Sequence, residues 1–177
     1  MARAAKLDLR RFQQELAARL AAKTTAQVEQ SRLGLACAGR QWLIRLADAG
    51  EVINVPTVAA VPLTKSWYLG ISNIRGNLYS VIDFAGFLAA KADGAQNTVA
   101  RSRLVLFGPR VGELRAGLVV PRVLGLRNLA QLQRHDDAVQ TGPAWYGSRW
   151  SDEHGAEWQE IDLAQLAEDP AFLQVGL

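Results

Sequence analysis

The fold is decided by the stretch from Pro56 to Phe84, whose centre reads Gly70-Ile-Ser-Asn73-Ile-Arg75-Gly76-Asn77-Leu-Tyr-Ser-Val-Ile-Asp83. Apolar and β-branched residues lead up to Arg75, and an alternating pattern follows from Leu78 to Ile82. Gly76-Asn77 can supply the positive φ angles of a two-residue turn, so the stretch predicts a β-hairpin. Because both faces of its second strand are largely apolar, we expect that strand in a small closed or doubly covered sheet.

Two polar side chains stand out beside this turn. Asn73 and Arg75 are two residues apart, which would place them on one face of the first strand. An amide and a guanidinium held this way form either a surface recognition point or a hydrogen-bonding brace for the turn. The residues alone leave both interpretations open.

The rest of the chain predicts many short strands between glycines and prolines, which favours a barrel or sandwich. No βαβ pattern is present, so a doubly wound fold is excluded. Asp48 to Glu51 should interrupt the strands, and Pro121 should mark a bulge or an edge. The expected strands are 33–36 and 42–46 about a Gly39-Arg40 turn, a short one between Pro56 and Pro62, 103–107, 114–120, 122–126, 145–150 and 157–161, with helical turns at 83–91 and 163–166 and irregular chain at 129–142.

The N-terminal region differs from the rest in charge. Residues 1–32 hold seven basic and three acidic groups, or +4, which leaves −1 of the total +3 for the remainder. Residues 7–23 predict an amphipathic helix that packs on its own domain, docks a partner or, least favoured, lies on a membrane. We therefore divide the chain into a basic helical extension and linker, 1–30, and a domain, 31–177. The nearly neutral body argues against nucleic-acid binding.

The sequence offers little for catalysis. It has no glycine-rich phosphate loop, Gly-x-Ser-x-Gly elbow or Cys-x-x-Cys pair. Cys37 predicts a buried structural thiol, and Asp83 a cap for the helical turn that follows it. His135 is expected in a solvated loop. The run Asp152-Glu-His-Gly155 with Glu157 could suggest a metal site, but it predicts a polar hairpin tip between Trp150 and Trp158.

These observations favour a binding module that needs no metal and no cofactor. The apolar runs are too short to span a bilayer, and charges interrupt any signal-peptide core, so we expect a cytoplasmic protein without direct membrane insertion. Two other classes stay open, namely a small nucleic-acid-binding β-barrel and an enzyme of unrecognised type. Retention of residues 31–177 on heparin would favour the first, and a bound ligand in native mass spectrometry the second.

Several motifs occur together with the hairpin. Val61-Pro62 and Trp67-Tyr68 precede Gly70-Ile-Ser-Asn73-Ile-Arg75-Gly76, and Val81-Ile82-Asp83 follows it; Glu51-Val52, Ala116-Gly-Leu-Val-Val120 and Ile161-Asp162-Leu163 extend the pattern over residues 31–168. The combination resembles the CheW family, the coupling proteins that join chemoreceptors to a histidine kinase. The family usually has Asp where this chain has Pro121. The basic N-terminal helix, Pro62-Leu-Thr-Lys-Ser-Trp67 and Trp145-Tyr-Gly-Ser-Arg-Trp-Ser-Asp152 resemble the PilI branch, adaptors of type IV pilus, or twitching-motility, chemosensory systems.

The resemblance implies a mainly β fold of two packed five-stranded, SH3-like barrels with short helices. It also implies a non-catalytic adaptor between a methyl-accepting chemoreceptor and a CheA-type histidine kinase, recruited to membrane-bound receptor arrays. The residues it carries over as partner-binding candidates are Glu51, Gly70, Asn73, Arg75 and Gly76. In this interpretation Gly70 permits close approach of a partner backbone, and Arg75 makes a charged hydrogen bond.

Overall fold

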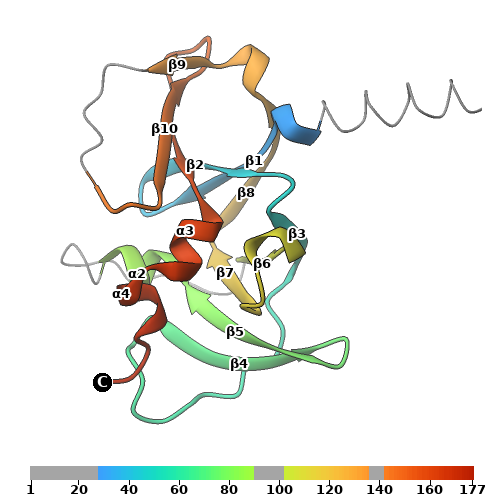
Figure 1. Ribbon diagram of the computed structural model, residues 1–177, viewed down its shortest axis with the longest axis vertical. Coiled ribbons are helices and arrows are strands. Elements are labelled where there is room, and N and C mark those ends of the chain that lie inside the picture. The colour runs from blue at the N-terminus through green and yellow to red at the C-terminus, as the bar shows by residue number, and fades with distance from the viewer. Residues whose placement is uncertain (1–27, 90–101, 136–141) are drawn as a thin grey trace, which may run out of the picture.

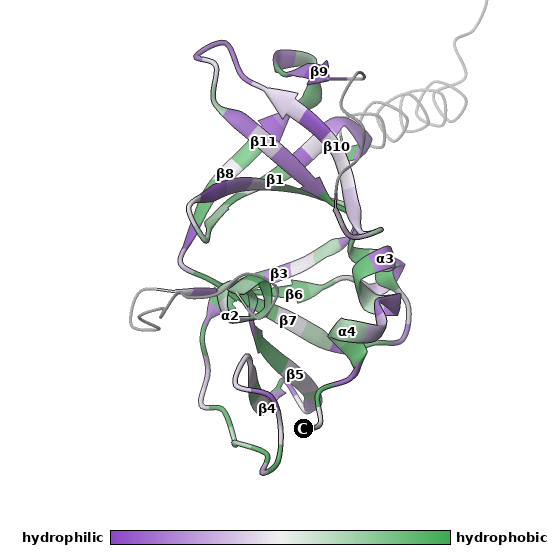
Figure 2. Ribbon diagram, turned by 90° about the vertical axis from the view of Figure 1, so that its left-hand side faces the viewer, coloured by the Kyte–Doolittle hydropathy of each residue, from purple (hydrophilic) through white to green (hydrophobic). Residues whose placement is uncertain are grey.

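The computed structural model describes residues 28–89, 102–135 and 142–177, which fold into two β-sheets stacked along the long axis (Figure 1). The predicted helix at 7–23 lies outside the described residues. Residues 28–30, expected in a linker, are helical. Each sheet curves on itself into a small barrel, as the family resemblance implies (Figures 1 and 2).

The first sheet, sheet A, combines strands from the beginning of the described chain with strands from its second half. Its strand order is β8-β1-β2-β11-β10-β9, with β11 parallel to β2. It has six strands instead of the expected five because a three-residue strand lies in the region expected to be irregular. The strands are β1 (Ser31–Cys37), β2 (Arg40–Arg45), β8 (Arg122–Asn128), β9 (Gln133–His135), β10 (Tyr146–Ser151) and β11 (Glu157–Ile161), with a 3₁₀ turn, η3 (Leu129–Gln131), before β9.

The second sheet, sheet B, is built from one continuous part of the chain inserted between β2 and β8. Its order is β3-β6-β7-β5-β4. β5 and β7 are largely hydrophobic, whereas β9, β10 and β11 of sheet A are mostly hydrophilic (Figure 2). The strands are β3 (Ala49–Asn54), β4 (Tyr68–Ile74), β5 (Asn77–Asp83), β6 (Arg103–Phe107) and β7 (Ala116–Val120), with a 3₁₀ turn, η2 (Pro109–Val111), between the last two.

Two predictions for sheet B are wrong in detail. Residues 49–51, expected to break the strand pattern, belong to β3, because Ala49 pairs with Phe107 across a register shift. The segment between Pro56 and Pro62 forms no strand of its own. It makes a single antiparallel bridge, Ala59 to Ile71, against β4.

Pro121 has a different role from the expected bulge or edge. It is the only residue between β7 of sheet B and β8 of sheet A, so the chain changes sheets there. A residue without a backbone N–H suits this position because it belongs to neither ladder. Its fixed φ angle also limits the directions in which β8 can leave β7.

An aromatic core lies between the two sheets. Trp42 of β2 packs against Phe84 and Trp145, with ring centroids 5.4 and 6.3 Å apart, and its Nε1 donates a hydrogen bond to the carbonyl of Cys37. Three short helices cover this core: α2 (Phe84–Ala89), α3 (Leu163–Glu168) and α4 (Pro170–Leu173). As predicted, Asp83 caps α2, because its Oδ1 accepts from the Ala85 N–H.

Cys37 is buried in this core, as expected for a structural thiol. Burial raises the pKa of its thiol to about 12, and the charge of Asp83 adds to the shift. The reactive thiolate is therefore essentially absent at neutral pH.

The interior of sheet A is polar by comparison. Arg32 of β1 donates from Nε to Glu160 Oε1 of β11 at 2.7 Å, and both side chains are about nine-tenths buried. Arg32 also donates to the Glu29 carbonyl, and the Glu29 carboxylate pairs with Arg110 of η2. These contacts attach residues 28–30 to both sheets.

Deleting residues 1–24 should leave a body that unfolds cooperatively, because the buried core of the described residues begins at Leu33. The deletion keeps Glu29 and Arg32, and it tests the domain division predicted from the sequence. Thermal unfolding followed by circular dichroism, with the full chain as reference, measures the outcome. Loss of a single cooperative transition would show that the Leu9-Phe12-Leu16-Leu20 stripe is part of the core.

Candidate functional site

The tip of the β4–β5 hairpin brings together most of the residues that the sequence singles out. Ile74 pairs with Asn77, so the two-residue turn is Arg75-Gly76, with φ angles of 51° and 84°. Positive φ at both positions is typical of a type I′ turn. The predicted hairpin is confirmed, but its turn lies one residue earlier than Gly76-Asn77.

This shift changes the position of Arg75. The residue lies in the turn, not on a strand face beside Asn73 as expected. Asn73 remains on β4, where its Oδ1 accepts a hydrogen bond from the Gly76 N–H at 2.9 Å. Asn73 therefore braces the turn, which was one of the two interpretations left open, whereas the Arg75 side chain points elsewhere.

Arg75 reaches across to the opposite edge of sheet B. Its Nη1 lies 2.7 Å from Oε1 of Glu51 on β3, with side chains 76% and 49% exposed. β3 and β4 are the two edge strands of this sheet, so the ion pair joins the ends of the sheet where the barrel closes. An ion pair this exposed contributes only about 0.2–1 kcal/mol to stability.

Further contacts close the same seam nearer the root of the hairpin. Ala59 and Ile71 exchange both backbone hydrogen bonds, at 2.8 and 3.0 Å. Ser72 Oγ donates to the Thr57 carbonyl. The segment after β3 is thus fixed to β4, and the Glu51–Arg75 pair is the exposed outer end of the closure.

Gly70 is required by this closure. It is buried with φ of 131°, and a Cβ there would lie 2.1 Å from the Ala59 carbonyl oxygen. The backbone that approaches Gly70 closely is therefore the chain's own. Whether a partner also approaches it stays a prediction.

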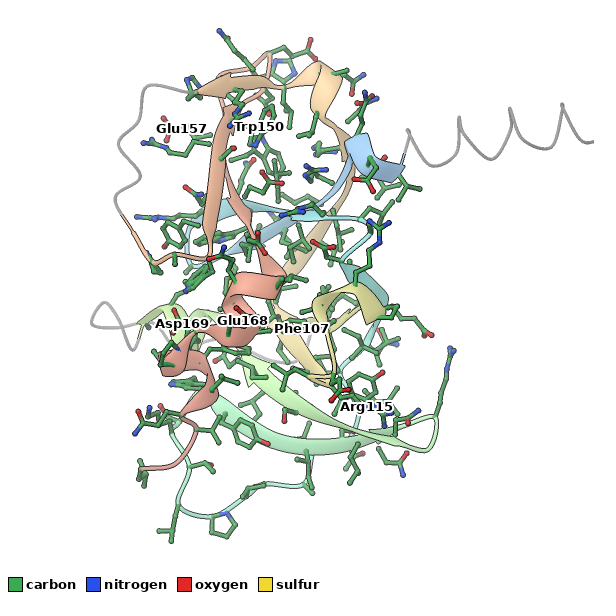
Figure 3. All side chains as sticks on the ribbon, in the orientation of Figure 1. Phe107, Arg115, Trp150, Glu157, Glu168 and Asp169 are labelled. Carbon is green, nitrogen blue, oxygen red and sulfur yellow. The ribbon has the colours of Figure 1, made fainter. Side chains whose placement is uncertain are left out.

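One contact at the tip was not expected from the sequence. Arg115, which precedes β7 and is labelled in Figure 3, donates a hydrogen bond from Nη1. Its acceptor is Asn77 Oδ1, at 2.7 Å. The two residues are 38 positions apart, and no motif links them. Only the parallel pairing of β5 with β7 brings them together.

The acidic hairpin tip between β10 and β11 has a structural role. Asp152 accepts hydrogen bonds from the backbone N–H groups of His154 and Ala156 and from Trp158 Nε1. The bond from Ala156 is the main reason that the pKa of Asp152 is lowered. Within residues 28–89, 102–135 and 142–177, no three His, Cys, Asp or Glu side chains are placed to share a metal ion.

His135, expected in a loop, lies on β9. Its Nε2 is 2.9 Å from Ser151 Oγ in an exposed contact between neighbouring strands. Asp136 and Asp137, which follow it, lie outside the described residues. Across the three described ranges, no helix combines the length and apolar character needed to cross a bilayer.

Comparison with known proteins identifies the family. A sequence model of the CheW-like domain matches residues 32–170. The chain belongs to the CheW-like domain family. The family predicted from the hairpin motif is therefore confirmed, and the match ends within α4.

Two individual proteins resemble this CheW-like domain. The chain is 30% identical over 122 residues to protein PilI of Pseudomonas aeruginosa, an alignment that covers 69% of this chain. The chain spans 66% of the length of that relative. It also resembles the crystal structure of the scaffolding protein TtCheW from Thermoanaerobacter tengcongensis, with a TM-score of 0.64 and 19% identity over 81% of this chain and 95% of that one. The second likeness concerns the fold, and it confirms the mainly β architecture.

Replacing Gly70 by alanine should abolish folding or lower the free energy of unfolding by more than about 4 kcal/mol, because the new Cβ overlaps a backbone carbonyl. Gly76→Ala is the matched control. Gly76 also has a positive φ, but nothing lies within 4 Å of its Cβ position, so this variant should lose only about 1–2 kcal/mol. Urea denaturation measures both. Equal losses of unfolding free energy in the two variants would show that the Ala59 backbone can move to make room for a Cβ at position 70.

Replacing His154 by alanine should change the free energy of unfolding by less than about 0.5 kcal/mol. The side chain is 83% exposed, and the turn uses only the backbone N–H of this residue, which alanine keeps. Asp152→Ala, which removes an acceptor of three hydrogen bonds, should lower the free energy of unfolding more than His154→Ala does. Metal analysis of the wild type and the His154 variant completes the test, and stoichiometric zinc lost with His154 would contradict it.

Proposed function

We propose that this chain is a non-catalytic adaptor that couples a methyl-accepting chemoreceptor to a CheA-type histidine kinase. The observation that carries the proposal is the CheW-like family match over residues 32–170. The identity with PilI supports a chemosensory pathway that controls type IV pili and twitching motility. The adaptor acts in the cytoplasm at membrane-bound receptor arrays, without inserting into the bilayer itself.

The partner-binding site in this proposal is the exposed tip of the β4–β5 hairpin. Arg75 provides the main polar contact, because a guanidinium has five N–H donors and only one bond to a described residue, Glu51, is present. Glu51 orients Arg75 from the opposite edge strand. Asn73 and Gly76 fix the turn, and Gly70 allows the seam beneath it to close. These are the five residues carried over from the family resemblance.

An adaptor of this kind catalyses no reaction, so its effect must come from differences in binding. It biases the kinase between two states only by as much as its contacts differ between them. A site whose ion pair contributes little to folding suits that role. Arg75 can exchange Glu51 for a partner group at small cost to the domain.

Replacing Arg75 by alanine should preserve the melting temperature and weaken binding of the receptor tip or the kinase regulatory domain by about 1.5–3 kcal/mol, the contribution of a charged hydrogen bond. Arg75→Lys should restore little, because an ammonium group cannot reproduce a two-pronged guanidinium contact. Asn73→Ala should instead lower the melting temperature, since the Gly76 N–H loses its acceptor. Calorimetric binding isotherms and thermal melts measure these effects.

Arg103→Ala is the matched control. Arg103 is an exposed arginine of β6 in the same sheet, and among the described residues its guanidinium donates only to the neighbouring Ser102 carbonyl. This variant should bind both partners normally. If Arg75→Ala also binds both normally, the hairpin tip is not the site, although the family assignment is unaffected.

A further inference from the structure

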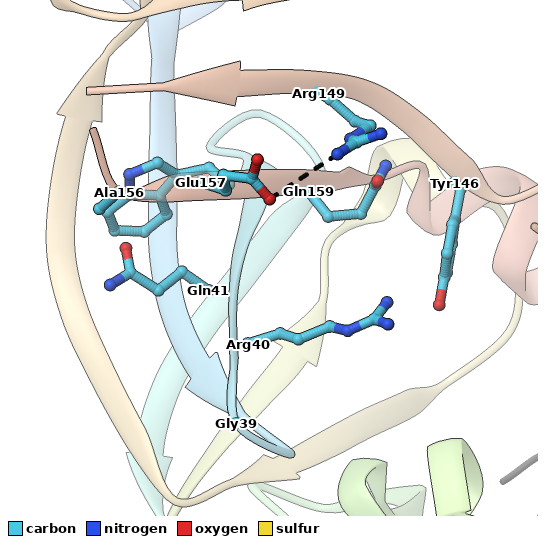
Figure 4. A pocket seen from close by; sticks show the side chains of 9 residues that line it. Gly39, Arg40, Gln41, Tyr146, Arg149, Ala156, Glu157 and Gln159 are labelled. Carbon is cyan, nitrogen blue, oxygen red and sulfur yellow. Dashed lines mark ion pairs between the residues drawn. The ribbon is translucent and has the colours of Figure 1, made fainter. Parts of the chain in front are cut away.

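A second surface, on sheet A, has the features of a binding site. A pocket of about 540 Å³ lies between β2 and β10, over β11 (Figure 4). Arg40, Tyr146 and Arg149 are among the side chains around it. The residues of the hairpin-tip site all belong to sheet B, so this pocket is separate from that site.

The pocket carries positive charge that the described chain does not neutralise. Arg40 is exposed and forms no ion pair with the described residues. Arg149 has only a long contact, 3.7 Å, to Glu157, and the two side chains are 46% and 77% exposed. Such a contact holds a guanidinium weakly. Two arginines and one glutamate therefore leave a net positive pocket.

Its remaining polar groups favour a peptide over a simple anion. Gln41 Oε1 is buried at the pocket and accepts no hydrogen bond from a described residue. Gln159, by contrast, uses its Nε2 on the Gly147 and Glu160 carbonyls. An unpaired buried acceptor is costly, so a ligand that brings an N–H donor is favoured there. A polypeptide supplies both backbone N–H groups and carboxylates.

Tyr146 adds an aromatic wall. Its ring packs against Trp42 and Trp145, which fixes its orientation. Burial raises the pKa of the Tyr146 hydroxyl, and the nearby charge of Arg40 partly opposes that effect. The hydroxyl is therefore neutral at physiological pH and presents no negative charge to a ligand.

We propose that this pocket binds an acidic segment of a partner protein, with Arg40 and Arg149 pairing with its carboxylates. In the free protein the Glu157 carboxylate lies beside the Arg149 guanidinium, and a carboxylate of the ligand takes its place. This site goes beyond the adaptor function proposed above and does not depend on the identity of the receptor or the kinase. It would give the domain a contact on sheet A in addition to the hairpin tip on sheet B.

Fluorescence anisotropy with the full chain tests the proposal. The probe is a fluorescein-labelled peptide in which glutamate alternates with glycine, and the reference peptide has glutamine in place of glutamate. Arg40→Ala and Arg149→Ala should each lower the affinity for the acidic peptide about two- to fivefold, as expected for exposed charge pairs. Glu157→Gln should raise it about twofold, because the competing carboxylate is gone. Arg103→Ala should have no effect.

The arginine variants should lower the affinity for the acidic peptide, whereas Glu157→Gln should raise it. Opposite effects of this kind indicate direct recognition of the peptide and not a structural role of these side chains. All three pocket side chains are exposed, and thermal melts should be unchanged in every variant. The proposal is overturned by equal binding of both peptides, by no binding of the acidic one, or by a loss with Arg103→Ala equal to that with Arg40→Ala. An oligothymidylate of equal charge is the third probe. If it binds through Arg40 and Arg149 more tightly than the peptide, the pocket is a nucleic-acid site and the proposal is wrong.

Discussion

Burial of aromatic side chains between the two sheets is the constraint on which the rest of this molecule depends. Sheet B encloses only a small cluster of its own, Val81, Leu104, Leu106 and Val119, and the interior of sheet A contains an ion pair. Small sheets of this kind bury too little apolar surface to be stable alone. The aromatic core between the sheets supplies the additional buried apolar surface that each sheet needs. Trp42 is its centre, fixed by a hydrogen bond to the Cys37 carbonyl.

This core also positions the tip of the β4–β5 hairpin, which we propose as the binding site. The root of the β4–β5 hairpin is held by Trp67, which packs against Phe87 and Phe172. The turn itself depends on a local bond from Gly76 to Asn73. Arg75 is therefore positioned by rigid neighbours while contributing little to stability, an arrangement that suits a residue that binds a partner.

Local patterns predicted most of the strands and the family, whereas contacts between residues far apart in the sequence set features that the patterns did not predict. Both tight hairpins place glycine second in the turn, Ala38-Gly39 and Arg75-Gly76, so sequence reasoning that put glycine first was wrong by one residue in each. The non-glycine residue there accepts a positive φ because the flanking strand pairs require it. Glycine is required at position 70 because the Ala59 carbonyl lies where a Cβ would be. Arg40 and Arg149 lie around the same pocket. The residues of each pair are not neighbours in the sequence, and no local sequence pattern predicts that they meet.

The strand order has a further consequence for how the chain is assembled. Sheet B is formed entirely by residues 49–120, whereas sheet A needs residues 31–45 together with residues 122–161. During synthesis from the N-terminus, β1 and β2 emerge first and must wait for the whole of sheet B before β8 and β11 can pair with them. In the sequence, sheet B is therefore an insertion between β2 and β8 of sheet A. The parallel pairing of β2 with β11 therefore closes sheet A last, and it can form only after β11 has been synthesised.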